Sequence, residues 1–286
     1  MIDFKRILFP VDFSAQCRAV APFVKAMANC FGAEVAALHV IEIPPSFAAM
    51  VEPEPLKIEA GTELNRFLAE EFPGVRVSAE LAGGDAAGGV VTYARDRHVD
   101  LIMMPTHGYG PFRALLLGSV TAKVLHDAHC PVWTGVHAEK MMAHSPERWK
   151  RVLCALDTET DSDSHAGHVL HWALEFASSQ NMELRVVHAV AGADGMWSEQ
   201  SDPSMYEFLF HAARERLAAL QAKVGTNLEI LLLPGRVGGA VHKAAAEFDA
   251  DVIVIGRGAA QQPFGRLRSD AYSIIREAPC PVISRP

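Results

Sequence analysis

The stretch KRILFPVD at residues 5–12 decides the fold, because it returns as KRVLCALD at residues 150–157. Three further pairs follow in the same order: LHV (38–40) with VHA (187–189), DLIMM (100–104) with DVIVI (251–255), and HCPV (129–132) with PCPV (279–282). Anchors repeated in one order indicate a tandem duplication with small changes in loop length. We therefore predict two domains, residues 1–137 and 150–286, joined by a polar linker at 138–149.

Within each half, short apolar runs alternate with amphipathic stretches. In the first half we expect strands at 6–11, 34–41, 75–81, 101–104 and 131–136, and helices at 15–31, 57–71, 84–97 and 119–128. Ser14 is a plausible N-cap for the first helix. Nearly continuous apolar strands are typical of a parallel sheet with helices on both faces. Right-handed crossovers then give a doubly wound α/β sheet in each half.

Composition narrows the range of functions. The 286 residues carry a formal net charge of -8, and 50% of them are hydrophobic. An acidic chain lacks the clustered positive charge that replaces phosphate counterions, so we expect no nucleic-acid partner. No apolar run approaches the length of about 18 residues that a membrane span needs, and no signal-peptide core is present. The five cysteines are widely spaced, which favours reduced thiols and a cytoplasmic location.

One loop has the composition of a phosphate site. The segment PTHGYGPFRALLLGS at residues 105–119 follows the fourth strand and leads into the next helix, whose first amides point outward with the positive end of the helix dipole. Arg113 and Lys123 add positive charge, and His107 lies near the expected phosphate. The segment is neither a Walker A loop nor a dinucleotide GxGxxG motif. Because glycine turns and serine caps also occur without ligands, an ordinary strand–helix turn remains the alternative.

Both halves resemble the universal stress protein family, over nearly all of the chain. The family pattern Gly-x2-Gly-x9-Gly-Ser/Thr falls on Pro105, Gly108, Gly118 and Ser119, so three of its four positions match. The resemblance implies that Asp12, after Pro10 and Val11, accepts from the adenine amino group and that the backbone of Val40 contacts adenine. It also implies phosphate binding by Gly108, Gly118, Ser119 and the amide of Val120, with the five-stranded Rossmann-like sheet of the family. Family dimers pair through the last strand, so we expect the two halves to form an intramolecular pseudo-dimer.

Two departures from the family pattern bear on binding. Pro105 has no N–H and a fixed φ, so it can neither donate to a ligand nor adopt a glycine conformation. In the second half Asp157 and Gly256 persist, but Ala259 replaces the second glycine, and Arg268 and Ser269 stand at the Gly-Ser position. We expect the first half to hold the nucleotide site and the second half to be degenerate.

Metal binding and catalysis have weak sequence support. His165, His168 and His171 are spaced at i, i+3 and i+6, but this spacing is looser than known zinc patterns and favours a solvated helix start. His39 and His188 occupy equivalent strand positions, where hydrogen-bonded core histidines are the favoured interpretation and a ligand contact the second. No nucleophile elbow or kinase motif is present.

The sequence thus predicts a regulatory, non-catalytic stress-response protein that binds ATP or another adenine nucleotide, either alone or together with Mg²⁺. Two alternatives stay open: a scaffold or interaction protein without nucleotide, and a slow ATPase that acts by electrostatic positioning. A homodimer beyond the internal pairing, the protein partner and the signal leave no readable trace in the sequence.

Overall fold

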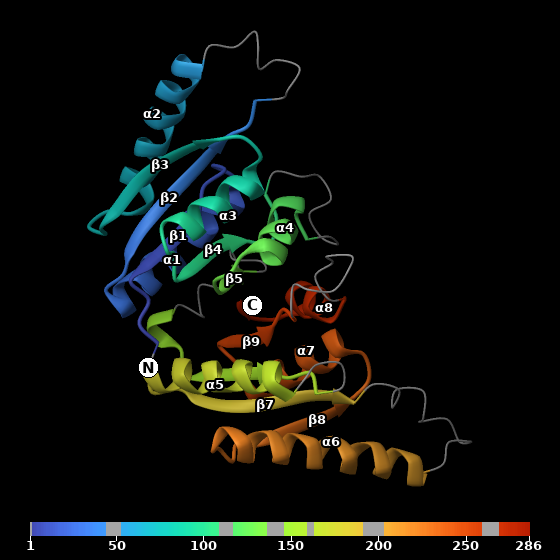
Figure 1. Cartoon of the computed structure of the whole chain (residues 1–286). Coiled ribbons are helices and arrows are strands. Elements are labelled where there is room, and N and C mark those ends of the chain that lie inside the picture. Colours follow the sequence, from blue (N-terminus) through green and yellow to red (C-terminus); the bar gives the residue numbers. More distant parts are fainter. Residues whose placement is uncertain are drawn as a thin grey trace. The chain divides into compact units, whose positions relative to one another are not determined.

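The computed structural model of the chain divides into two compact units, Asp3–Arg148 and Trp149–Pro286 with Ile2, called here the N-terminal unit and the C-terminal unit (Figure 1). The structure describes residues 2–43, 53–108, 117–135, 146–158, 163–190, 203–258 and 269–286. None of the described helices is long and apolar enough to cross a membrane.

The N-terminal unit alternates strands and helices along the chain. Its elements are β1 (Arg6–Pro10), α1 (Ala15–Phe31), β2 (Glu34–Ile41), α2 (Pro53–Glu71), β3 (Val77–Gly83), α3 (Ala86–Asp96), β4 (Leu101–Pro105), α4 (Ser119–Asp127) and β5 (Val132–Gly135). The strands pair in parallel in the order β3-β2-β1-β4-β5. The order reverses between β1 and β4, where Ile7 faces Leu101 and Leu8 faces Ile102. In a doubly wound sheet this reversal is the place where ligands bind.

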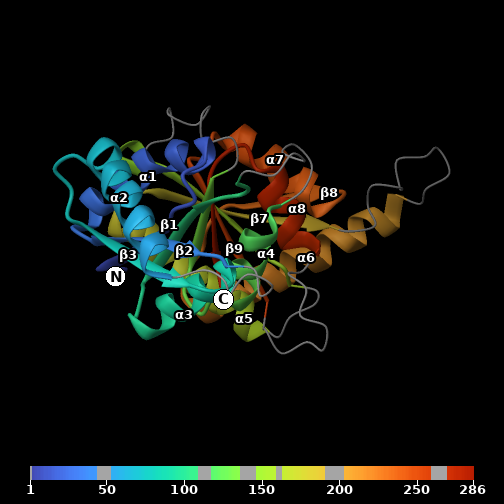
Figure 2. The ribbon, with the colours of Figure 1, turned by 90° about the horizontal axis from the view of Figure 1, so that it is seen from above.

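Helices cover the sheet of the N-terminal unit on both faces. The helices α1 and α2 contact each other, as do α3 and α4, and Figure 2 shows α1 and α3 on opposite sides of the strands. Every residue of β4 is buried, and so are the three central residues of β1. This explains the uninterrupted apolar runs, since a strand with both faces covered has no side chain in water. Trp133 of β5 packs 5.5 Å from Phe23 of α1, between ring centroids, and both are buried.

Local chemistry sets the element ends. The Ser14 side chain accepts from the Cys17 N–H at 3.1 Å, which confirms the predicted N-cap of α1. The predicted strand at 75–81 begins two residues too early, because the Val75 N–H donates to Phe72 in the turn after α2. The predicted helix at 84–97 also begins too early, because Asp85 is the N-cap of α3 and accepts from the Gly88 N–H.

The C-terminal unit repeats the same order. Its elements are β6 (Arg151–Ala155), α5 (Asp163–Ser179), β7 (Glu183–Val190), α6 (Pro203–Val224), β8 (Ile230–Pro234), α7 (Val237–Phe248), β9 (Val252–Gly256), α8 (Ser269–Glu277) and β10 (Val282–Arg285). The strand order is β8-β7-β6-β9-β10, all parallel. Of the predicted linker, residues 138–145 lie outside the described residues, and Pro146–Arg148 form the 3-10 helix η3 against α1.

Candidate functional site

A pocket of about 770 Å³ opens at the reversal point between β1 and β4 of the N-terminal unit. Its volume lies within the range of about 300–1,000 Å³ that small-molecule sites occupy. The ends of β1, β2 and β4 and the starts of α3 and α4 line it. The predicted site residues in its wall are Pro10, Val11, Asp12, Val40, Pro105, His107, Gly108, Gly118, Ser119 and Val120. Another predicted residue, Arg113, lies outside the described residues.

Asp12 stands where β1 ends, with its carboxylate held in one orientation. Oδ1 accepts the Ser14 N–H at 2.9 Å, while Oδ2 lies so close to Gly108 that a Cβ at that position would overlap it. The close approach explains why a glycine stands at position 108. Asp12 is exposed, so the carboxylate can accept from a ligand in the pocket.

The first turn of α4 faces the same pocket. Gly118 is the N-cap and has no side chain, so the cap residue makes no side-chain hydrogen bond to the first amides of the helix. The Gly118 N–H donates to Thr106 at 2.8 Å, and Thr121 Oγ1 donates to the Pro105 carbonyl at 3.0 Å. These two bonds fix the helix start against the end of β4. An uncapped helix N-terminus favours anions through its N–H groups and its dipole.

Pro105 takes part in this anchoring through its carbonyl, which needs no N–H. It is buried, ends β4 and lies opposite Gly135 in the pairing with β5. The residue therefore serves as wall and acceptor in the N-terminal unit, two roles that proline can fill.

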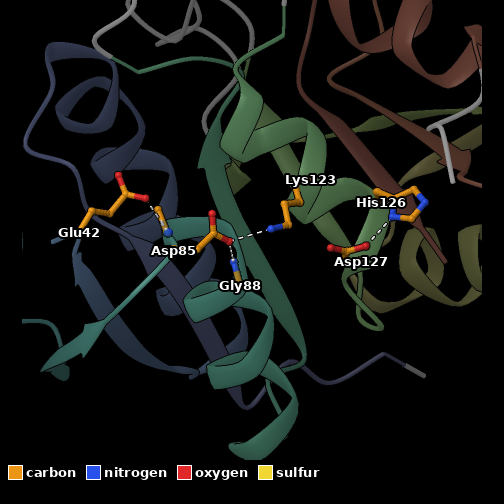
Figure 3. Close-up of polar contacts among 7 residues, drawn as sticks. Glu42, Asp85, Gly88, Lys123, His126 and Asp127 are labelled. Carbon is orange, nitrogen blue, oxygen red and sulfur yellow. Dashed lines mark hydrogen bonds and ion pairs between the residues drawn. The ribbon is translucent and has the colours of Figure 1, made fainter. Parts of the chain in front are cut away.

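The start of α3 is occupied by carboxylates, in contrast to the start of α4. Asp85 accepts from the Gly88 N–H at 2.7 Å and Glu42 accepts from the Ala86 N–H at 2.9 Å (Figure 3). Lys123 reaches from α4 to within 2.8 Å of Asp85. The Lys123 ammonium, followed by the Gly88 N–H, holds the pKa of Asp85 below its ordinary value. The start of α3 is thus closed to a further anion, and Lys123, predicted to face phosphate, has a carboxylate partner.

Comparison with known proteins places these features in a family. The profile of the universal stress protein family matches residues 3–134 and again residues 148–284. The chain belongs to the universal stress protein family. It is 34% identical to universal stress protein MJ0531 of Methanocaldococcus jannaschii over 137 residues, which cover 45% of this chain and 80% of that protein. A universal stress protein of Thermus aquaticus is 35% identical over 136 residues, covering 45% of this chain and 96% of that protein.

Similarity over the whole chain comes from a solved structure. A universal stress protein from Archaeoglobus fulgidus superposes with a TM-score of 0.70 at 23% identity, covering 98% of this chain and 97% of that one. At this level of identity the likeness establishes the fold alone. Together with the repeated family match, it confirms the two tandem α/β domains that the sequence repeat predicts.

The pocket wall of this universal stress protein contains further polar residues. His39 of β2 donates from Nδ1 to the Val11 carbonyl at 2.8 Å, a hydrogen-bonded strand histidine as expected from the sequence, and it also lines the pocket. Glu42 and Thr121 line the pocket too, and the sequence did not point to them. Phe13, at a left-handed φ of 61°, lays its ring 4.7 Å from the His39 ring, between centroids. A non-glycine residue in this region is strained and is held there by its packing.

The remaining predicted positions lie in the C-terminal unit. Asp157 and Gly256 line a second pocket at the ends of β6 and β9. Ala259 and Arg268 lie outside the described residues, and Ser269 is the first residue of α8. Among the described residues, no group of three His, Cys, Asp or Glu side chains is placed to hold a metal ion.

Proposed function

We propose that this universal stress protein binds an adenine nucleotide, ATP in the first instance, in the pocket of the N-terminal unit, and that binding serves regulation of the stress response rather than catalysis. The observation that carries the proposal is the uncapped start of α4 in the wall of a 770 Å³ pocket that also contains the Asp12 carboxylate. The carboxylate suits the adenine amino group, which is a donor, and the amides suit the phosphates, which are acceptors.

The two ends of the pocket have complementary roles in this proposal. Asp12 would read the base at the end of β1, supported by the Ser14 amide. The amides of Ser119 and Val120 would meet the phosphates, because the start of α3 already holds Asp85 and Glu42. A bound nucleotide that favours one conformation of the protein would then transmit nucleotide level to a partner.

Calorimetric titration of the full chain with ATP, with and without Mg²⁺, tests the proposal. We expect saturable binding that weakens at least about tenfold in Ser119→Asp, because a carboxylate in the first turn repels phosphate while it stabilises the helix by about 0.3–1 kcal/mol. The matched control is Ser269→Asp, at the first residue of α8, which should leave ATP affinity unchanged. Absence of binding heat in the wild type, or equal affinity in Ser119→Asp, overturns the proposal.

A second candidate is a scaffold or interaction protein that binds no nucleotide. It is favoured by the charges of the pocket: among the described lining residues there are two carboxylates, Asp12 and Glu42, and no lysine or arginine. Mass spectrometry of gently purified protein separates the two candidates, since the first predicts co-purified adenine nucleotide and the second predicts none.

A further inference from the structure

The pocket of the C-terminal unit differs in size from its counterpart. It has a volume of about 130 Å³, against about 770 Å³ in the N-terminal unit. One reason is the close approach of α5 to the end of β9: a Cβ at Gly256 would lie 2.7 Å from His165 Nε2 and 2.9 Å from Val169 Cγ2. A cavity of about 150 Å³ with apolar walls accommodates one benzene ring. The C-terminal pocket therefore has room for a single ring and not for a nucleotide.

The wall of this pocket is mostly aliphatic. Ala166 and Val169 come from α5, Val241 from α7 and Ile274 from α8, and all four are buried. This part of the wall offers no side-chain hydrogen-bond partner to water, and an ordered water needs two to four polar partners. Burial of an apolar ring there is favourable by the ordinary hydrophobic effect.

One buried polar atom at this wall has no partner. His188, only 3% exposed, donates from Nδ1 to the Leu156 carbonyl at 2.8 Å. Because a carbonyl can only accept, Nδ1 carries the proton, and in the neutral ring Nε2 is left as an acceptor. Among the described residues no group donates to His188 Nε2, although the ring lines the pocket. A buried acceptor without a donor is unfavourable, so a ligand that donates there gains affinity.

The charges at the pocket define the ligand further. Asp157 and Asp270 line it, and no lysine or arginine does so among the described residues. Two carboxylates at the wall repel an anion, so a neutral ring is favoured over an aromatic acid.

From this geometry we propose that the C-terminal pocket binds a neutral single-ring compound that donates a hydrogen bond to His188 Nε2, a ligand of the phenol class. The two units of the chain then have sites of different size and for different classes of ligand. The proposal stands on the C-terminal unit and does not depend on nucleotide binding in the N-terminal unit.

The test is calorimetric or NMR titration of the full chain with phenol, toluene and benzoate. We expect phenol to bind saturably and benzoate not to bind. Toluene has the same shape without the donor, so the ratio of phenol to toluene affinity should fall about three- to tenfold in His188→Leu. The matched control is His39→Leu, which removes the equivalent ring and its bond to the Val11 carbonyl and should leave the ratio unchanged.

A second measurement on the wild type keeps the proposal testable if His188→Leu does not fold. The ¹⁵N resonance of His188 Nε2 should move toward the protonated value when phenol is added, and should not move with toluene. Absence of saturable phenol binding, an unmoved Nε2 resonance, or loss of phenol binding in His39→Leu overturns the proposal. Phenol affinity should persist in Ser119→Asp, so failure of nucleotide binding and failure of phenol binding are separate results.

Discussion

Two neighbouring glycines in α7, Gly238 and Gly239, provide a matched pair for measuring how tightly α7 packs on α8. At Gly239 nothing lies within 4 Å of an added Cβ, whereas at Gly238 the Cβ would lie 2.8 Å from Glu277 Oε2 and 3.0 Å from Ser273 Cβ. Alanine in place of a helical glycine stabilises by about 0.5–1 kcal/mol. At Gly238 that gain is opposed by overpacking, which costs about 1–3 kcal/mol.

We therefore expect Gly239→Ala to raise the free energy of unfolding of the C-terminal unit by about 0.5 kcal/mol and Gly238→Ala to lower it by about 1 kcal/mol. Hydrogen exchange of the β6 and β9 amides measures the free energy of unfolding of the C-terminal unit, whereas a single denaturation midpoint would average over the two units. Equal shifts in both variants would refute the packing geometry between α7 and α8, since the helix-propensity gain is common to them.

Gly108→Ala should weaken ATP binding at least about tenfold, because the added Cβ overlaps the Asp12 carboxylate and displaces it. Gly83→Ala is the control: nothing lies within 4 Å of its Cβ, so ATP affinity should not change. Titration calorimetry measures both affinities. Lys123→Ala should raise the pKa of Asp85 toward its ordinary value, which NMR of the carboxyl group would measure. Because the ion pair lowers this pKa, the pair stabilises the folded protein at pH values above the ordinary pKa of Asp85. That stabilisation disappears as the pH falls through the lowered pKa. Burial raises the pKa of the Cys154 thiol, so iodoacetamide should label it only after unfolding, as mass spectrometry would show; rapid labelling of the folded chain would contradict this.

Hydrophobic periodicity in the sequence predicts the strands and helices themselves better than it predicts the residues at which they begin and end. The apolar runs at β1 and β4 predict buried parallel strands, because a strand covered on both faces must be apolar throughout. The start of α3 and the start of β3 are less well predicted. Their bounds depend on the Asp85 cap and the turn at Val75, which are single hydrogen bonds with little trace in hydrophobic periodicity.

The sequence predicts which strand ends carry the candidate site, but it does not predict the ion pairs around that site. Chain order alone puts Asp12 and Gly108 at adjacent strand ends, and the structure brings their atoms together. No pattern in the sequence says that Lys123 pairs with Asp85, since they are 38 residues apart and meet only because α3 and α4 pack together.

The sequence by itself determined that the chain is a duplicated α/β protein, because it repeats one order of apolar strands and amphipathic helices, and such elements bury their apolar faces by packing helices on a parallel sheet. Tertiary structure alone decided that the two pockets differ in volume and in the hydrogen-bond partners of the polar side chains that line them. Their lining residues come from separate elements, and small changes in the approach of helix to strand, as at Gly256, set a volume that no local stretch of sequence encodes.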